Sequence, residues 1–260
     1  MPTVAAGGRE VYYQEAVPAT PRPFAPPVVL VHGAGGSGDK WREQLGALAA
    51  RGYRPVAIDL PGHGRSGGEG LRQVDGYRDV VLDFVDELRL DPLVLVGHSM
   101  GGAIAQAFAL AYPDRLVGLA LVGTGAKLRV HPDILTAHAR GEVSPEFVAA
   151  GFRAHPEAGL VRQEAEALRR TPSDVRYGDF LACDAFNAVE VVGEIRLPTL
   201  VLVGREDRMT PVKYSHFLAE RIADSRLVIV EGAGHYVMLE QPAEVNRALL
   251  DFLAEVGKAT

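Results

Sequence analysis

The feature that most constrains this fold is a short apolar run that ends in a glycine-flanked serine and continues into a helix-forming segment. The run Leu93–Val96 has a β-type pattern and leads into the turn Gly97-His98-Ser99-Met100-Gly101-Gly102. An alanine-rich segment with helical composition then extends to Tyr112. This order predicts a strand, a sharp turn and a helix. Because glycines beside Ser99 let the two elements approach closely, we expect its hydroxyl to project above one end of a sheet.

Length and composition limit the classes of protein to which this chain can belong. The chain has 260 residues, 47% of them hydrophobic, which is enough for one large α/β domain or for one domain with an insertion. The net charge of -6, without any Lys/Arg block, argues against nucleic acid as a partner. No apolar run approaches the length of a membrane span, and the first residues lack the pattern of a signal peptide. We therefore expect a cytoplasmic protein with no membrane partner.

Strand and helix patterns alternate along most of the chain. Before residue 126, strands are predicted at 9–15, 27–31, 54–59, 93–96 and 116–122, and helices at 40–51 and 71–90. After residue 196, strands are predicted at 198–204 and 226–230, and helices at 212–222 and 242–255. Such alternation indicates a mostly parallel, doubly wound α/β sheet that is covered by helices on both faces.

The alternation stops between residues 126 and 196, where the patterns are short and helical, as at 145–154 and 161–170. We predict that residues 1–125 and 197–260 form the core domain and that 126–196 form a helical cap over the active end of the sheet. Two cap charges, Lys127 and Arg129, are interpreted as solvated, with contact to an anionic substrate as the alternative. The single cysteine, Cys183, excludes an internal disulfide and fits a reducing compartment, and its role stays open.

A serine hydroxyl needs a base to remove its proton, and that base needs an anchor. The segment after the strand at 198–204 contains the adjacent carboxylates Glu206 and Asp207, and the segment after 226–230 contains His235. The chain order Ser99, Asp207, His235 is the order found in α/β-hydrolases. Glu206 is the alternative carboxylate.

Five motifs now occur in the expected order: HGAGGSG at 32–38, DLPGHGRS at 59–66, GHSMGG at 97–102, GREDRMTP at 204–211 and GAGHYVMLEQP at 232–242. On these motifs the sequence resembles an α/β-hydrolase-fold serine hydrolase along almost its whole length. It looks most similar to small capped bacterial carboxylesterases and enol-lactonases. The resemblance implies an α/β-hydrolase fold with a helical cap inserted after the sixth strand.

The resemblance also implies roles for individual residues. Ser99 would be the nucleophile, His235 the general base and then acid, and Asp207 the carboxylate that orients His235. The backbone N–H groups of Ala34 and Met100 would form the oxyanion hole. The implied reaction is hydrolysis of small carboxylic esters, thioesters or lactones through an acyl-enzyme, without a cofactor.

Other residues receive weaker assignments. Trp41, Met209 and Tyr236 are candidates for an apolar substrate pocket, although core packing is an equal alternative for Trp41. His32 and His63 lie in glycine-rich turns and are interpreted as structural. The histidines show no metal-ligand spacing, so no metal is implied.

Three rival functions remain open. A carbon–carbon bond hydrolase would use the same three side chains, and a cofactor-free perhydrolase or haloperoxidase would need peroxide. A non-enzymatic receptor for a small ligand is the third rival. The natural substrate, the acyl and alcohol preference and the oligomeric state are not specified by these patterns.

Overall fold

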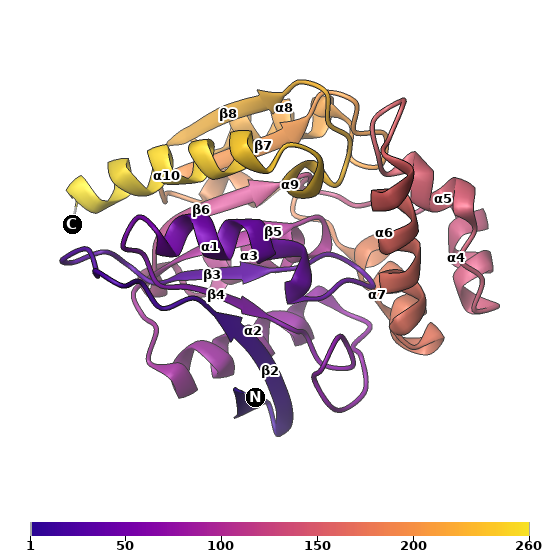
Figure 1. The fold of residues 1–260 in the computed structure, drawn as a ribbon, viewed down its shortest axis with the longest axis horizontal. Helices are drawn as coiled ribbons and strands as arrows, with labels where there is room; N and C mark the ends of the chain where they lie inside the picture. Colours follow the sequence, from indigo (N-terminus) through magenta and orange to yellow (C-terminus); the bar gives the residue numbers. More distant parts are fainter. Residues whose placement is uncertain (1, 260) are drawn as a thin grey trace.

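The computed structural model describes residues 2–259 and is built around one eight-stranded sheet (Figure 1). The strands lie in the order β1-β2-β4-β3-β5-β6-β7-β8. They are β1 (Thr3–Ala6), β2 (Arg9–Glu15), β3 (Val28–Val31), β4 (Pro55–Ile58), β5 (Leu93–His98), β6 (Leu116–Val122), β7 (Thr199–Gly204) and β8 (Ser225–Val230). Pairing is antiparallel from β1 through β2 to β4 and parallel across the rest. The predicted mostly parallel sheet is confirmed.

Helices cover both faces of the sheet, as a parallel sheet requires. The core helices are α1 (Arg42–Ala49), α2 (Val74–Leu88), α3 (Met100–Ala111), α8 (Val212–Arg221), α9 (Val237–Glu240) and α10 (Pro242–Ala259). Short 3-10 turns lie at Gly38–Trp41, Pro113–Arg115 and Val192–Glu194. Buried side chains of α2, α3 and α8 form one core cluster, and those of α1, α9 and α10 form another. The sheet is therefore packed from both sides, which fixes the positions of the strand ends.

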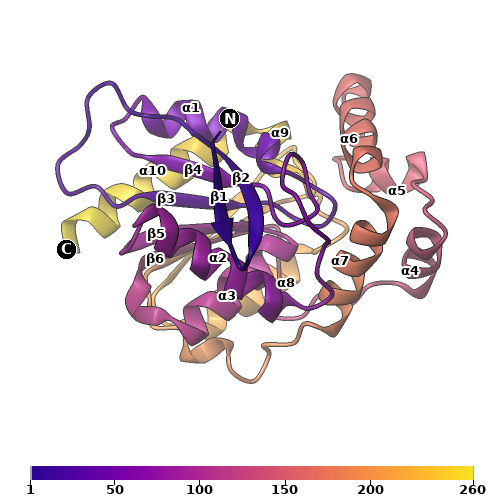
Figure 2. The same ribbon diagram turned by 90° about the horizontal axis from the view of Figure 1, so that it is seen from below.

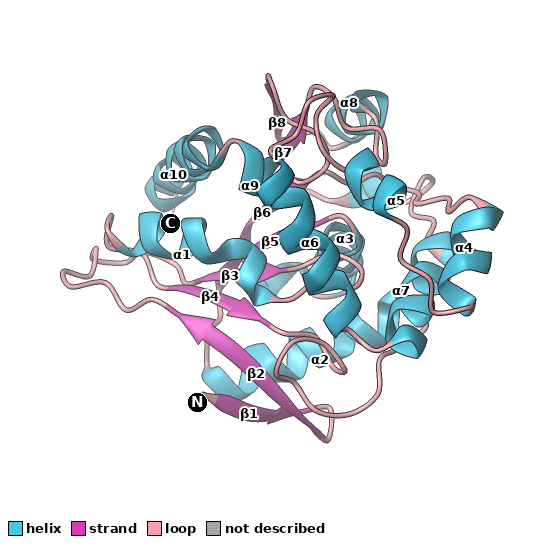
Figure 3. Ribbon diagram, turned by 45° about the vertical axis from the view of Figure 1, so that its right-hand side comes forward, coloured by secondary structure: helices cyan, strands magenta, loops and turns pink. Residues whose placement is uncertain are grey.

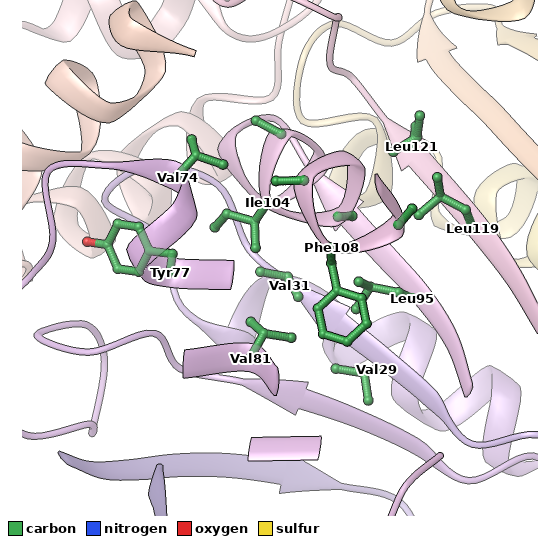
Figure 4. Packing of buried hydrophobic residues seen from close by; sticks show 14 of the residues in the cluster. Val29, Val31, Val74, Tyr77, Val81, Leu95, Ile104, Phe108, Leu119 and Leu121 are labelled. Atoms are coloured by element: carbon green, nitrogen blue, oxygen red, sulfur yellow. The ribbon is translucent and has the colours of Figure 1, made fainter. Parts of the chain in front are cut away.

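The first cluster explains why the segment around Ser99 folds as predicted. Ile104 and Phe108 of α3 pack against strand residues such as Val31 and Leu95, as Figure 4 shows. Phe84 of α2 is fully buried in the same cluster. Apolar positions spaced by three and four residues give both helices a continuous buried face.

Residues 126–196 contain four helices: α4 (Pro132–Ala139), α5 (Pro145–Ala150), α6 (Ala158–Arg170) and α7 (Ser173–Ala185). Figures 1 and 2 show them together on one side of the molecule, beyond one end of the strands, and Figure 3, in which that side is turned forward, shows α6 in front of the sheet. A bridge between Lys127 and Asn187, with the Ala188 N–H donating to the Ala126 carbonyl at 2.7 Å, closes the base of this insertion. We call residues 126–196 the cap, and its action as a lid stays a prediction.

The structure also contains elements that the periodicity did not predict. Strand β1 was not predicted; it pairs with β2 and takes the edge position of the sheet. Helices α4 and α7 were not predicted, because glycine, polar residues and short length obscure their apolar spacing. Residues 1 and 260 of the predicted core ranges lie outside the described residues. Within residues 2–259, no helix has the length and apolar character needed to span a bilayer.

Candidate active site

Ser99 lies at the junction between β5 and α3 in a strained backbone conformation, with φ 54° and ψ -115°. The strain is maintained by close packing, since a Cβ on Gly97 would lie 2.1 Å from the Gly101 carbonyl oxygen. Hydrogen bonds hold the residue on both sides: its N–H donates to the Val122 carbonyl at 3.0 Å, and its carbonyl accepts from Thr124 Oγ1 at 2.8 Å. The serine thus lies where the sequence motif predicts, at the end of a central strand.

Asp207 and His235 follow β7 and β8 and are joined by a hydrogen bond. His235 Nδ1–H donates to Asp207 Oδ2 at 2.9 Å, and both side chains are buried. Asp207 also accepts from the Thr210 N–H at 2.8 Å and from Thr210 Oγ1 at 2.7 Å. Burial by itself would raise the pKa of Asp207, but the charge and hydrogen bond of His235 and the donors of Thr210 hold it below its ordinary value. The carboxylate is therefore ionised and fixes the tautomer of His235.

The alternative carboxylate, Glu206, is directed elsewhere. Its Oε2 accepts from the N–H of Ala154, a cap residue, at 2.7 Å. Asp207 is thus the one of these two neighbours that binds His235.

Ser99 and His235 line the same cavity. Within residues 2–259, however, no hydrogen bond joins the Ser99 hydroxyl to His235 directly. Such bonds are often long in unliganded enzymes and shorten when substrate binds. The structure therefore brings the two side chains to one cavity.

His98, the residue before the serine, received no role from the sequence patterns, but its side chain also lies at the site. Its ring lines the cavity, 4.6 Å from the His235 ring between centroids. Its Nε2–H donates to the His235 carbonyl at 2.9 Å. Burial, followed by the nearby His235, lowers the pKa of His98 well below its ordinary value. His98 is thus a neutral side chain that supports the backbone of His235.

Ala34 belongs to a tight turn beside Ser99. The Gly36 N–H donates to the Gly33 carbonyl at 3.0 Å, and a Cβ on Gly33 would lie 3.0 Å from the Ser99 Cβ. Met100 is the first residue of α3, where backbone N–H groups lack partners within the helix. In the described part of the chain, neither the Ala34 N–H nor the Met100 N–H donates a hydrogen bond to another protein group. Both donors are available to a ligand.

The cavity has a volume of about 330 Å³ and is lined by residues of the core loops and of the cap. Met209 and Tyr236 line it, as expected for pocket residues. Trp41 does not: its side chain is fully buried in the core cluster of α1 and α10, so core packing explains it.

Cap residues contribute much of the apolar wall, namely Leu128, Val130, Ile134, Phe147, Ala150, Leu168, Phe180 and Cys183. Arg129 lines the cavity, whereas the backbone of Lys127 forms an antiparallel bridge with Asn187 at the base of the cap. Burial raises the pKa of the Cys183 thiol, which keeps it protonated. Among residues 2–259, no group of three or more His, Cys, Asp or Glu side chains is placed to hold a metal ion.

Two buried charged contacts near the cavity were missed by the sequence reasoning. Lys40, after β3, is paired with Glu164 of α6, and its ammonium lies 4.8 Å from the centre of the Tyr236 ring. Asp179 of α7 is paired with His63 at 2.7 Å. The spacing of Val175, Asp179 and Cys183 places this acid on the buried face of its helix, which is a signal present in the sequence.

Comparison with known proteins agrees with this geometry. Residues 28–248 match the model of the alpha/beta hydrolase family. A relative from Variovorax paradoxus named "Putative carbamate hydrolase RutD" is 33% identical over 246 residues, which cover 88% of this chain and 92% of that protein.

Two solved structures share the fold. A thermophilic esterase has a TM-score of 0.84 and 34% identity, covering 98% of this chain and 97% of the other. The enol-lactonase from Burkholderia xenovorans LB400 has a TM-score of 0.88 and 25% identity, covering 97% of this chain and all of the other. With a family match across most of its length and similar structures of hydrolases, this chain belongs to the alpha/beta hydrolase family.

Proposed function

We propose that this hydrolase cleaves small carboxylic esters or lactones through an acyl-enzyme formed on Ser99. One observation carries the proposal: a strained, cavity-facing serine shares its cavity with a histidine that is hydrogen-bonded to a buried, ionised aspartate. An imidazole held in this way can accept the serine proton and return it to a leaving group. The similarity to an esterase and an enol-lactonase supports the same bond type.

The reaction has two halves. Ser99 Oγ attacks the carbonyl carbon while its proton passes to His235 Nε2, and the Asp207 carboxylate stabilises the resulting imidazolium. The N–H groups of Ala34 and Met100 donate to the tetrahedral oxyanion. When the carbon–oxygen bond breaks, His235 protonates the leaving alcohol. Water then loses a proton to His235 and attacks the acyl carbon. When the bond to Ser99 Oγ breaks, His235 returns that proton to Ser99, and the acid is released.

The cavity favours compact, largely apolar acyl groups. Its volume of about 330 Å³ lies at the small end of ligand pockets. Apolar side chains from the cap and from Met209 and Tyr236 supply most of its wall. We therefore expect short or branched acyl chains and small lactones to be turned over best.

The proposal is tested by labelling with a fluorophosphonate and by turnover of a substrate panel. Wild type should be labelled once, and Ser99→Ala should neither be labelled nor retain turnover, with a loss of about 10⁶-fold. The panel contains p-nitrophenyl esters of graded chain length, small lactones, a carbamate and a vinylogous diketone, with a peroxide-dependent oxidation assay beside it. Labelling that persists in Ser99→Ala would move the nucleophile elsewhere, and preference for the diketone or for peroxide would replace the ester assignment.

A further inference from the structure

The cap and the turn that carries Ala34 are joined by a buried polar cluster to which the proposed reaction steps assign no role. Asp179, on α7 of the cap, is fully buried. Its Oδ2 accepts from the Gly35 N–H at 2.8 Å and from His63 Nε2 at 2.7 Å, and its Oδ1 accepts from the Tyr77 hydroxyl at 2.6 Å. One cap carboxylate thus binds three separate segments of the core.

Two cap side chains hydrogen-bond the backbone of Gly35, one at its N–H and one at its carbonyl. While its N–H donates to Asp179, its carbonyl accepts from Thr171 Oγ1 at 2.9 Å, and Thr171 also belongs to the cap. The fit is close, because a Cβ on Gly35 would lie 2.3 Å from Leu168 Cδ1 of α6. Its φ of 63° also favours glycine here. The cap therefore fixes the residue that follows Ala34.

We propose that Asp179, assisted by Thr171, is a positioning residue that holds the Ala34 N–H in place for the oxyanion when the cap is seated. The inference rests on the proposed function, since the oxyanion arises only if Ser99 forms a tetrahedral intermediate. Asp179 touches no reacting atom and acts through Gly35. Docking of the cap on the core domain and assembly of the oxyanion hole then occur together.

Charge strengthens the hydrogen bonds that Asp179 accepts. His63 Nδ1 faces the Pro61 carbonyl at 3.0 Å while its Nε2 faces Asp179, so both ring nitrogens donate. Burial by itself would lower the pKa of His63, but Asp179 outweighs it and raises the pKa above its ordinary value. Asp179 therefore accepts charge-assisted bonds, which are shorter and stronger than neutral ones.

The size of the expected effect follows from the role of oxyanion donors. Removing one such donor lowers turnover by about 10²- to 10³-fold. Asp179→Ala loosens a donor without removing it, so we expect kcat to fall by about 10- to 100-fold with KM changed by less than about 3-fold. Thr171→Val should have a smaller effect in the same direction.

The experiment compares four variants on one p-nitrophenyl ester: Asp179→Ala, Asp179→Asn, Thr171→Val and Tyr77→Phe. Asparagine retains an oxygen that can accept from Gly35, so it should restore most of the kcat lost in Asp179→Ala. Tyr77→Phe is the matched control, since it removes a bond to Asp179 but leaves Gly35 bound. It should lower the melting temperature while keeping kcat.

A second readout separates positioning from general damage. A boronic acid forms a tetrahedral adduct on a serine and places an oxygen in the oxyanion hole. Its affinity should fall in parallel with kcat in Asp179→Ala, while affinity for the carboxylic acid product stays unchanged. Wild-type kcat in Asp179→Ala, or losses of kcat that follow melting temperature across all four variants, would overturn the inference.

Hydrogen exchange distinguishes failure of this inference from failure of the proposed function. If wild type cleaves no ester, the proposed function fails, but the Gly35 amide can still be measured. Protection of that amide in wild type and its loss in Asp179→Ala would support the inference that Asp179 holds Gly35 in place. Equal exchange in the two proteins would contradict it, whatever the reaction.

Discussion

The two walls of the cavity are built by different means. On the core side, Ser99, Asp207 and His235 are placed by backbone turns at the ends of parallel strands and are held by hydrogen bonds, one of which runs from the His235 N–H to the carbonyl of the cap residue Gly151 at 2.7 Å. On the cap side, helices dock through buried charges, with Asp179 on His63 and Glu164 on Lys40. The core wall carries the proposed reacting groups, whereas the cap wall is held by ion pairs that are costly if incomplete.

The two walls of the cavity should respond differently to amino-acid substitutions. Turn positions in the core wall depend on glycine and, at Ser99, on a strained backbone that close packing of the neighbouring residues maintains. The cap wall is mostly apolar on its cavity side, with Arg129 as an exposed exception, and Glu164 and Asp179 are buried where the cap meets the core. Substitutions in the core wall should therefore affect chemistry first, and substitutions at the Lys40–Glu164 contact should affect stability first, whereas Asp179, which also binds Gly35, should affect both.

The largest effects are expected in the core wall. His235→Ala should lower kcat by about 10⁶-fold and Asp207→Asn by about 10⁴-fold, because the base is lost in one and misoriented in the other. Steady-state kinetics with melting temperatures would show chemistry lost in a folded protein. Glu206→Gln is the control, since Glu206 binds Ala154 rather than His235. If it were as damaging as Asp207→Asn, the assignment of the acid would be wrong.

An intermediate effect is expected where α6 meets the core. Glu164→Ala leaves the ammonium of Lys40 buried without its partner and should lower the free energy of unfolding by about 3 to 5 kcal/mol. Urea unfolding measures this. Glu166→Ala, at an exposed position on the same helix, should change it by less than about 0.5 kcal/mol. Equal losses in the two variants would show that the pair does not secure the cap.

The smallest effect concerns a cap histidine and pH. His138 stacks on Phe180 with ring centroids 4.2 Å apart, and burial, then Arg176, lowers its pKa to about 4, with Asp179 opposing. Since the unfolded chain protonates this histidine near pH 6.5 and the folded one only near 4, stability is lost as pH falls through that interval.

His138→Phe should therefore make the free energy of unfolding fall less steeply between pH 6.5 and 4 than in wild type. Urea unfolding at several pH values measures the slope. At pH 8, where the histidine is neutral in both states, the variant provides a baseline for packing changes alone. Identical slopes in the two proteins would show that His138 is not a buried neutral group.

Much of the core could be predicted from sequence because its signals are local. The strand, turn and helix around Ser99 follow from residues within twenty positions, and the segments holding Asp207 and His235 follow short apolar runs. Strand β1 could not be foreseen, since a short polar strand is stabilised by pairing with β2 rather than by its own pattern. For Trp41, local pattern could not separate pocket from core, and packing beneath α1 and α10 decided it.

Local patterns in the sequence are enough to specify the alternating architecture and the order of the candidate catalytic residues, because hydrophobic period and glycine turns act over a few neighbouring positions. Only the tertiary structure decided which charges become buried partners. Asp179 and His63 are 116 positions apart, and Lys40 and Glu164 are 124 apart. A charged side chain in isolation predicts solvent exposure, and it is buried only where folding supplies an opposite charge and the remaining hydrogen bonds.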